Sequence, residues 1–226
     1  MKKLLTLILA LAMALSLVAC GSSDKKDDSG EKTYTVGVVQ LVQHEALDAA
    51  TKGFTDALKE ALGDKVNVVV KNASGDSNTC GTIVNGFLAD NVDLIMANAT
   101  PALQAAASAT STVPILGTSV TDYATALEIA NWTGTVGGNI SGTSDLAPLD
   151  QQAAMLQELF PNAKKVGMLF CSSEPNSKYQ VDEVTKLLSN AGITCTEFAF
   201  TDSNDVSSVT QKACDASDVL FIPTDN

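Results

Sequence analysis

Residues 34–63, YTVGVVQLVQHEALDAATKGFTDALKEALG, join a β-branched apolar run to an amphipathic segment. The run from Tyr34 to Leu41 has the composition of a buried strand. Beyond it, apolar residues recur with helical spacing until Gly63, and we predict that they form the buried face of a helix, at positions 46, 49, 50, 53, 54, 57, 58, 61 and 62. A strand followed directly by a helix is the repeating unit of a parallel sheet that helices cover on both faces.

The same alternation continues through the rest of the chain. Before residue 142 we predict strands at 66–70, 92–97 and 113–116, a helix with a buried stripe of Ile83, Val84, Phe87 and Leu88, and a helix that Thr100 caps and Pro101 begins. After residue 142 we predict helices at about 146–159, after Glu174-Pro175 and at about 205–214, and strands at 166–170, 193–198 and 219–222. Such alternation indicates an α/β protein with parallel sheets and right-handed crossovers.

The chain is predicted to have four parts, which are a signal peptide (1–19), a flexible linker (20–33), a first lobe (34–142) and a second lobe (143–226). Residues 21–32, GSSDKKDDSGEK, contain no large apolar side chain, which is typical of a solvated spacer. The printed sequence stops at Asn226 directly after a predicted strand, without the helix that would cover that strand. We therefore expect the second lobe to be incomplete.

The N-terminal segment has the features of an export signal. Lys2 and Lys3 precede an apolar run from Leu4 to Val18, which at about fifteen residues is shorter than the roughly twenty that a membrane-spanning helix needs. The tetrad Leu17-Val18-Ala19-Cys20 resembles a bacterial lipobox. We predict that Cys20 is lipidated, with acyl chains such as palmitate, and anchors the protein to the extracytoplasmic face of the cell membrane. The competing interpretation is a buried apolar helix with an ordinary cysteine.

Composition excludes several classes of protein. With 45% hydrophobic and 18% charged residues, the chain is globular rather than disordered. The 26 Asp and Glu residues outnumber 14 Lys and Arg residues, which gives a net charge of -12, and all of the cations are lysines. Nucleic-acid binding requires clustered cations, so we expect no nucleic-acid partner.

Catalytic and metal-binding motifs are lacking in the sequence. His44 is the only histidine, which excludes a three-histidine metal site here, and neither a phosphate-binding loop nor Gly-x-Ser-x-Gly occurs. A nucleophile paired with His44 is not ruled out, but no residue is singled out for that role. We therefore expect no enzymatic activity, no cofactor and no metal. For Cys80, Cys195 and Cys214 we favour small buried hydrophobic side chains over a disulfide. Cys171 differs, because it ends a predicted strand beside the polar loop Ser172-Ser173-Glu174.

Short polar residues gather in the loops that follow the predicted strands. In open α/β sheets, ligands bind beyond the carboxyl ends of the strands, where helix N-termini present free N–H groups. The candidate ligand-binding residues are Gln43, His44, Asn98, Thr100, Pro101, Ala102, Thr118, Ser119, Asp122, Ser172, Ser173, Glu174, Asn176, Ser177, Thr224, Asp225 and Asn226. Each loop also has a structural interpretation, since Ser, Thr, Asp and Asn are common helix caps.

Five stretches at ordered spacing resemble the ABC-transporter substrate-binding lipoproteins associated with tryptophan and tyrosine uptake. They are His44-Glu-Ala-Leu-Asp48, Ala99-Thr-Pro-Ala-Leu-Gln104, Gly138-Asn-Ile-Ser-Gly-Thr-Ser-Asp145, Ser172-Ser-Glu-Pro-Asn-Ser177 and Pro223-Thr-Asp-Asn226. The resemblance implies a type I periplasmic-binding-protein fold, with two Rossmann-like lobes joined by a hinge and a small-molecule ligand in the cleft. It also implies delivery of the ligand, most simply an aromatic amino acid, to an ABC permease with its ATPase. We expect a monomer, and the alternative function is a lipid-anchored ligand sensor that signals to a membrane receptor.

If the ligand is an amino acid, as the resemblance implies, its carboxylate needs hydrogen-bond donors, and the printed sequence has no arginine. The available donors are the N–H groups at the start of the helix after Thr100-Pro101 and hydroxyls such as those of Thr100, Ser173 and Ser177. The candidate acceptors for the ammonium group are Asp225, Asp122 and Glu174, and the candidates for an apolar floor are Leu41, Ala102 and Tyr179. The alternative interpretation of Tyr179 is that it only packs in its own helix. We expect loss of the Asp225 carboxylate to weaken binding without changing the stability of the unliganded protein. Two departures from the family pattern are Glu45, in place of a proline, and Trp132, for which we favour packing over ligand contact.

Overall fold

The computed structural model describes residues 32–225, and all structural statements below concern that part of the chain. The predicted signal peptide, the lipidation site Cys20 and the candidate ligand-binding residue Asn226 lie outside the described residues. Within residues 32–225, no helix combines the length and apolar character needed to cross a membrane.

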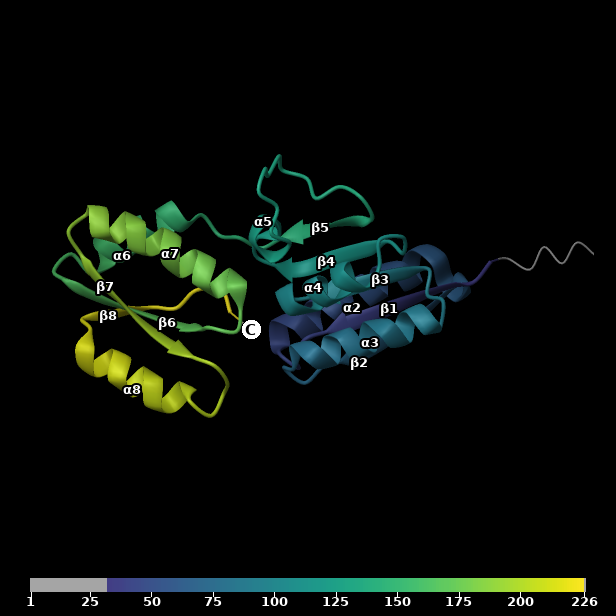
Figure 1. Ribbon diagram of the computed structural model, residues 1–226, viewed down its shortest axis with the longest axis horizontal. Coiled ribbons are helices and arrows are strands. Elements are labelled where there is room, and N and C mark those ends of the chain that lie inside the picture. The colour runs from purple at the N-terminus through teal and green to yellow at the C-terminus, as the bar shows by residue number, and fades with distance from the viewer. Residues whose placement is uncertain (1–31, 226) are drawn as a thin grey trace, which may run out of the picture. The chain divides into compact units, whose positions relative to one another are not determined.

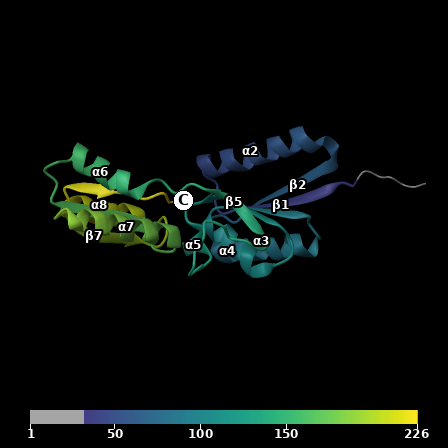
Figure 2. The same ribbon diagram turned by 90° about the horizontal axis from the view of Figure 1, so that it is seen from above.

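The first lobe contains a five-stranded sheet in the order β2-β1-β3-β4-β5, with all neighbouring strands parallel (Figure 1). Its strands are β1 (Tyr34–Gln40), β2 (Val66–Asn72), β3 (Leu94–Asn98), β4 (Ile115–Val120) and β5 (Ile140–Ser144). Its helices are α2 (Glu45–Leu62), the 3-10 turn η1 (Gly63–Lys65), α3 (Ser77–Ala89), α4 (Thr100–Ala109) and the short α5 (Tyr123–Ala126). Figure 2 shows α2 on one side of these strands and α3 and α4 on the other.

The second lobe contains a three-stranded parallel sheet in the order β7-β6-β8. Its strands are β6 (Lys165–Cys171), β7 (Thr194–Phe200) and β8 (Val219–Phe221), and its helices are α6 (Leu149–Leu159), α7 (Pro175–Asn190) and α8 (Val206–Ala216). Figure 1 shows α6 and α7 on one side of the strands and α8 on the other. The predicted α/β class with two parallel sheets is therefore confirmed.

Each sheet has its own apolar core. In the first, Val39 and Ile95 of the strands pack with Phe87 of α3 and Leu103 of α4. In the second, the core contains Val166, Met168 and Phe170 of β6, together with Leu156 of α6 and Val181, Val184 and Leu188 of α7. Strands β1 and β6 are buried almost continuously rather than at alternate positions, because helices cover both faces of a parallel sheet.

The predicted buried face of α2 is partly wrong. Leu47 and Thr51 are its buried residues, whereas Ala46, Ala49 and Gly53 are exposed. The buried face is therefore rotated by about one position, and its Thr51 hydroxyl donates a hydrogen bond to Gln40 Oε1 at 2.6 Å. The prediction treated alanine and glycine as apolar residues that must be buried. These residues have little apolar surface, so exposing them to water costs little free energy.

Strand β5 was not predicted, and the predicted division at residue 142 falls inside it. The sequence of β5, ISGTS, has a single large apolar residue, so it lacks the usual strand signal. Gly142 is required there because an added Cβ would lie 2.1 Å from the Tyr123 hydroxyl and 2.2 Å from the Gly117 carbonyl oxygen. Tyr123 donates to the Thr143 carbonyl at 3.2 Å, and burial raises the pKa of Tyr123 to about 12, which keeps this donor protonated.

Candidate functional site

The predicted binding loops lie at the carboxyl edges of the two sheets. In the first lobe they follow β1, β3 and β4, and in the second they follow β6 and β8. Because all strands within a sheet are parallel, the loops of each lobe share one edge. The two edges are described separately below.

The start of α4 is an uncapped helix N-terminus. The cap residue is Ala99 rather than the predicted Thr100, and no side chain accepts a hydrogen bond from the first turn. Ala99 has φ 93° and ψ 158°, a conformation that costs energy for any residue with a Cβ. Thr100 is 0% exposed, and its Oγ1 has no hydrogen-bond partner among the described residues. The free N–H groups and helix dipole at this end favour an anion.

Asn98, at the end of β3, uses its side-chain amide nitrogen in hydrogen bonds, whereas its side-chain oxygen has no partner in the described chain. Its Nδ2 donates to the Leu47 carbonyl at 2.8 Å and to Thr51 Oγ1 at 2.9 Å, which ties β3 to the first turns of α2. Its buried Oδ1 has no partner among residues 32–225. Gln40 was not among the candidates, yet its Nε2 donates to the Val42 carbonyl and to Asp48 at 2.8 and 2.6 Å and so holds the loop that follows β1.

Two of the remaining first-lobe candidates, His44 and Asp122, are helix caps. His44 is exposed and caps α2, with Nδ1 accepting from Ala46 N at 3.3 Å, and Gln43 beside it is exposed. Asp122 caps α5 by accepting from the main chain and hydroxyl of Thr125, at 2.9 and 2.6 Å. Thr118 and Ser119 are half-buried, and Ser119 has φ 53°. Pro101 and Ala102 are buried in the first turn of α4.

The start of α7 resembles that of α4. Glu174 is the cap residue without a side-chain capping bond, and proline again begins the helix. Asn176 and Ser177 are 2% and 0% exposed, and Asn176 Oδ1 and Ser177 Oγ have no partner in the described chain. The Nδ2 of Asn176 donates to the Thr224 carbonyl at 3.3 Å and lies 3.5 Å from the carboxylate of Glu174, which is itself buried.

The two serines after β6 tie that strand to the end of β7. Ser172 Oγ donates to the Phe200 carbonyl at 3.1 Å, and Ser173 Oγ donates to the Thr201 carbonyl at 3.5 Å. Ser173 Oγ also lies 2.9 Å from the Sγ atom of Cys171. Ser173 is therefore not a helix cap, and both serines are exposed.

The segment after β8 is fastened to α7 and β6. Gln180, which the sequence did not suggest, bonds to both main-chain groups of Thr224, and Asp225 Oδ2 accepts from Cys171 N at 2.8 Å. The Thr224 side chain is exposed. Asn176 and Gln180 lie four residues apart, so their carboxamides are on one face of α7. This spacing is the sequence signal that could have indicated Gln180 as a residue that contacts the same loop.

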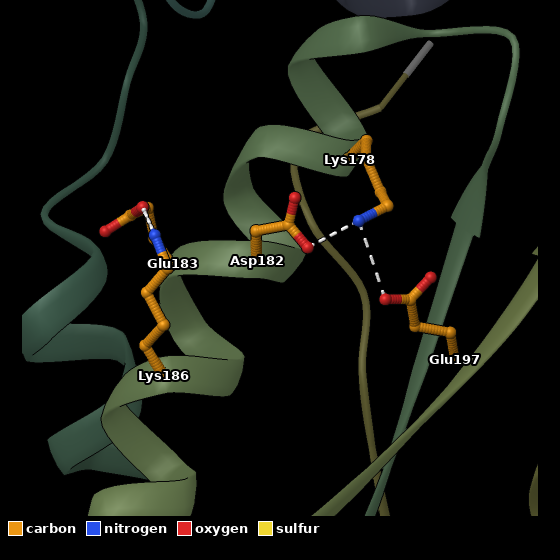
Figure 3. A network of polar contacts seen from close by, with 5 residues as sticks. All are labelled: Lys178, Asp182, Glu183, Lys186 and Glu197. Carbon is orange, nitrogen blue, oxygen red and sulfur yellow. Dashed lines mark hydrogen bonds and ion pairs between the residues drawn. The ribbon is translucent and has the colours of Figure 1, made fainter.

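Lys178, the lysine nearest in sequence to the start of α7, is paired with two carboxylates. Lys178 Nζ lies 2.5 Å from Asp182 and 3.6 Å from Glu197 of β7, and Figure 3 shows it directed at both. The hydrogen bond from Lys178 to Asp182 raises the pKa of Lys178. Lys186 pairs with Glu183 one turn further along (Figure 3). The groups at the start of α7 that could donate to an anion are therefore main-chain N–H groups and hydroxyls rather than this lysine.

The three residues of the predicted apolar floor are not equally buried, and the same is true of the four cysteines. Leu41 and Ala102 are buried, whereas Tyr179 is half-buried and burial raises its pKa. Trp132 is 42% exposed and borders a hollow of about 300 Å³ with Tyr123, so the favoured packing role is not observed. The cysteines of the described chain are free. Cys80 is buried and Cys195 half-buried, as expected of small hydrophobic side chains, whereas the same prediction is wrong for Cys214, which is exposed. Cys171, at the end of β6, is also buried.

Comparison with known proteins gives consistent matches. A family described as ABC transporter substrate binding protein matches residues 35–226. A tyrosine-binding protein of Clostridioides difficile (strain R20291) is 37% identical over 237 residues, covering 100% of this chain and 68% of the relative.

Two solved structures are similar over most of the described chain. One, from Streptococcus pneumonia in complex with L-Trp, has a TM-score of 0.80 and 35% identity, covering 86% of this chain and 66% of that one. The other is a ligand-free, open substrate-binding protein with adhesive properties from Clostridium difficile, with a TM-score of 0.58, 38% identity and the same coverage of 86% and 66%. The chain thus spans about two thirds of the length of these relatives.

Proposed function

Because the chain belongs to the ABC transporter substrate-binding protein family and has a type I periplasmic-binding-protein fold, we propose that it captures an amino acid for import. The family consists of solute-binding proteins rather than enzymes. The ligand we propose is aromatic, such as tryptophan, tyrosine or phenylalanine, and the protein acts as a monomer that delivers it to an ABC permease driven by its ATPase. The family assignment favours this function over a lipid-anchored sensor.

One observation carries the proposal, which is the set of buried polar atoms at the starts of α4 and α7. Six buried side-chain oxygen atoms have no hydrogen-bond partner among the described residues, and four belong to Asn98, Thr100, Asn176 and Ser177. An unpaired buried polar group costs about 1–3 kcal/mol, so folded proteins rarely keep one without a reason. A polar ligand that pairs with these atoms would offset that cost.

The groups at these two edges match an amino-acid zwitterion. N–H groups of the α4 first turn and the hydroxyls of Thr100 and Ser177 are donors for the carboxylate. Asp225 accepts a hydrogen bond from Cys171 N, and a carboxylate can accept several hydrogen bonds at once, including those of an ammonium group. Asp122 and Glu174 are the other proposed ammonium acceptors.

Replacing the unpaired hydroxyls tests the proposal. We expect Thr100→Val and Ser177→Ala each to weaken binding of L-tryptophan or L-tyrosine by about tenfold, because a ligand hydrogen bond is lost. The same variants should leave the unliganded protein as stable as the parent or about 1 kcal/mol more stable, since an unsatisfied buried hydroxyl is removed. Calorimetric titration and chemical unfolding of the full-length protein measure the two effects.

Thr55→Val is the matched control. Thr55 Oγ1 is also buried without a partner in the described chain, but it lies in the middle of α2 rather than at a helix N-terminus. This variant should leave affinity unchanged. Lower stability together with unchanged affinity in Thr100→Val and Ser177→Ala would show that these hydroxyls are structural.

We also propose that the protein is an extracytoplasmic lipoprotein anchored through Cys20. The support is the tetrad Leu17-Val18-Ala19-Cys20 after a charged start and a short apolar run. In Cys20→Ser, acylation and membrane retention should be lost, and the protein should move to the soluble extracytoplasmic fraction. Labelled palmitate incorporation and fractionation measure this, with Cys214→Ser as the control because Cys214 is an exposed free thiol. Membrane retention of a Cys20→Ser protein whose signal peptide has been removed would argue against the anchor.

A further inference from the structure

Gln180, a buried side chain of α7, bonds to both main-chain groups of Thr224 in the segment from Pro223 to Asp225. Gln180 is 0% exposed, and its Nε2 donates to the Thr224 carbonyl at 2.9 Å while its Oε1 accepts from Thr224 N at 3.0 Å. The same Nε2 also lies 3.1 Å from the Asn176 carbonyl. The carboxamide thus satisfies both main-chain groups of one residue, as a neighbouring strand would.

This pairing replaces sheet contacts that the segment lacks. Strand β8 ends at Phe221, so the main chain of Thr224 is beyond the strand ladder. Asn176 adds a second bond to the Thr224 carbonyl, and Asp225 continues the attachment through Cys171 N. The orientation of the Thr224 main chain therefore determines where the Asp225 carboxylate lies.

We propose that Gln180 is a positioning residue of the ligand site, which holds the main chain of Thr224 so that Asp225 stays beside the start of α7. The inference rests on the proposed function. Gln180 contributes by fixing the loop before the ligand arrives, so that binding does not incur the entropy cost of ordering it.

Gln180→Glu gives a test that acid can reverse. An ionised carboxylate at this position cannot donate to the Thr224 carbonyl and places negative charge against it, whereas a protonated carboxyl has one donor and one acceptor and can restore both bonds. Burial raises the pKa of the introduced carboxyl, and the carboxylates of Glu174 and Asp225, on the two elements that Gln180 joins, act in the same direction. Glu174, Asp225 and Lys178 are present in both the parent and Gln180→Glu. The ratio of the two proteins' affinities at each pH therefore reports the effect of the side chain at position 180 alone.

We expect Gln180→Glu to bind L-tryptophan or L-tyrosine about tenfold or more weakly than the parent at about pH 8, and within about threefold of it at about pH 5. Gln180→Met should bind these amino acids more weakly than the parent at both pH values. Its side chain forms neither hydrogen bond to Thr224 and has no group whose protonation could restore one. Gln157→Glu is the matched control, since Gln157 is half-buried and its Nε2 bonds to the Ala153 carbonyl within α6. Its affinity ratio should not change with pH.

The outcomes separate this inference from the proposed function. If the full-length parent binds neither amino acid, the proposed function is wrong. If the parent binds and Gln180→Glu matches it at pH 8, or stays weak at pH 5, the positioning role is wrong. Melting temperatures are recorded at both pH values. Should Gln180→Glu be unfolded at pH 8, Gln180→Met decides, and unchanged affinity in that variant overturns the inference.

Discussion

Replacing Asp225 with alanine is expected to weaken amino-acid binding by about thirtyfold, the scale of losing a hydrogen bond to a charged group. The unliganded protein should also lose about 1–3 kcal/mol of unfolding free energy, because Cys171 N loses the carboxylate that accepts its hydrogen bond at 2.8 Å. The sequence alone predicted no change in stability, since the contact between Asp225 and β6 depends on the fold.

Asp225→Asn separates the two effects. Its amide oxygen can still accept from Cys171 N, so the unfolding free energy should stay near that of the parent, while loss of the negative charge should weaken binding of the ligand ammonium group. Titration calorimetry and urea unfolding of the three full-length proteins give both quantities. An Asp225→Asn protein with unchanged affinity would exclude Asp225 as the ammonium acceptor.

Replacing Gly37 with alanine is expected to lower the unfolding free energy by about 1–3 kcal/mol, at the upper end of that range. Gly37 lies in the middle of β1, and an added Cβ would be 2.6 to 2.9 Å from three ring atoms of Phe87. Phe87 is 1% exposed in the first core, and the Lys71 ammonium lies 5.7 Å from its ring centroid. The ring cannot move away without displacing its neighbours in α3 and the sheet.

Gly53→Ala is the matched control, because nothing lies within 4 Å of an added Cβ at this position in α2. That variant should be more stable by about 0.5–1 kcal/mol, since alanine favours a helix over glycine. Adding Phe87→Leu to Gly37→Ala should recover part of the loss. Urea unfolding in which Gly37→Ala is as stable as the parent would contradict the packing between β1 and α3.

Much of the fold could be predicted because its signals are local. Buried parallel strands such as β6 (Lys165–Cys171) are short apolar runs, and the buried residues of helices such as α7 recur with a period of about 3.6. Strand β5 could not be predicted, because its place in the sheet depends on Tyr123 packing over Gly117 and Gly142 rather than on its own composition.

The sequence predicted which loops form the candidate site, but not which contacts their side chains make. Strand ends rich in short polar residues indicated the two edges, since ligands of parallel sheets bind there. Whether a hydroxyl is a cap or is left unpaired depends on tertiary structure, and so Ser173 and Thr100, which look alike in sequence, differ in bonding. Gln180 is a polar residue inside a helix, and its role emerges only when Thr224 is brought against it.

Isothermal titration of L-tryptophan and of L-tyrosine into the full-length protein tests the central claim most directly. We expect saturable binding of at least one of them at one site per molecule, with a higher melting temperature in its presence because the ligand binds only the folded state. A folded protein that shows neither heat of binding nor a thermal shift with either amino acid would contradict the claim that the two edges form an amino-acid site.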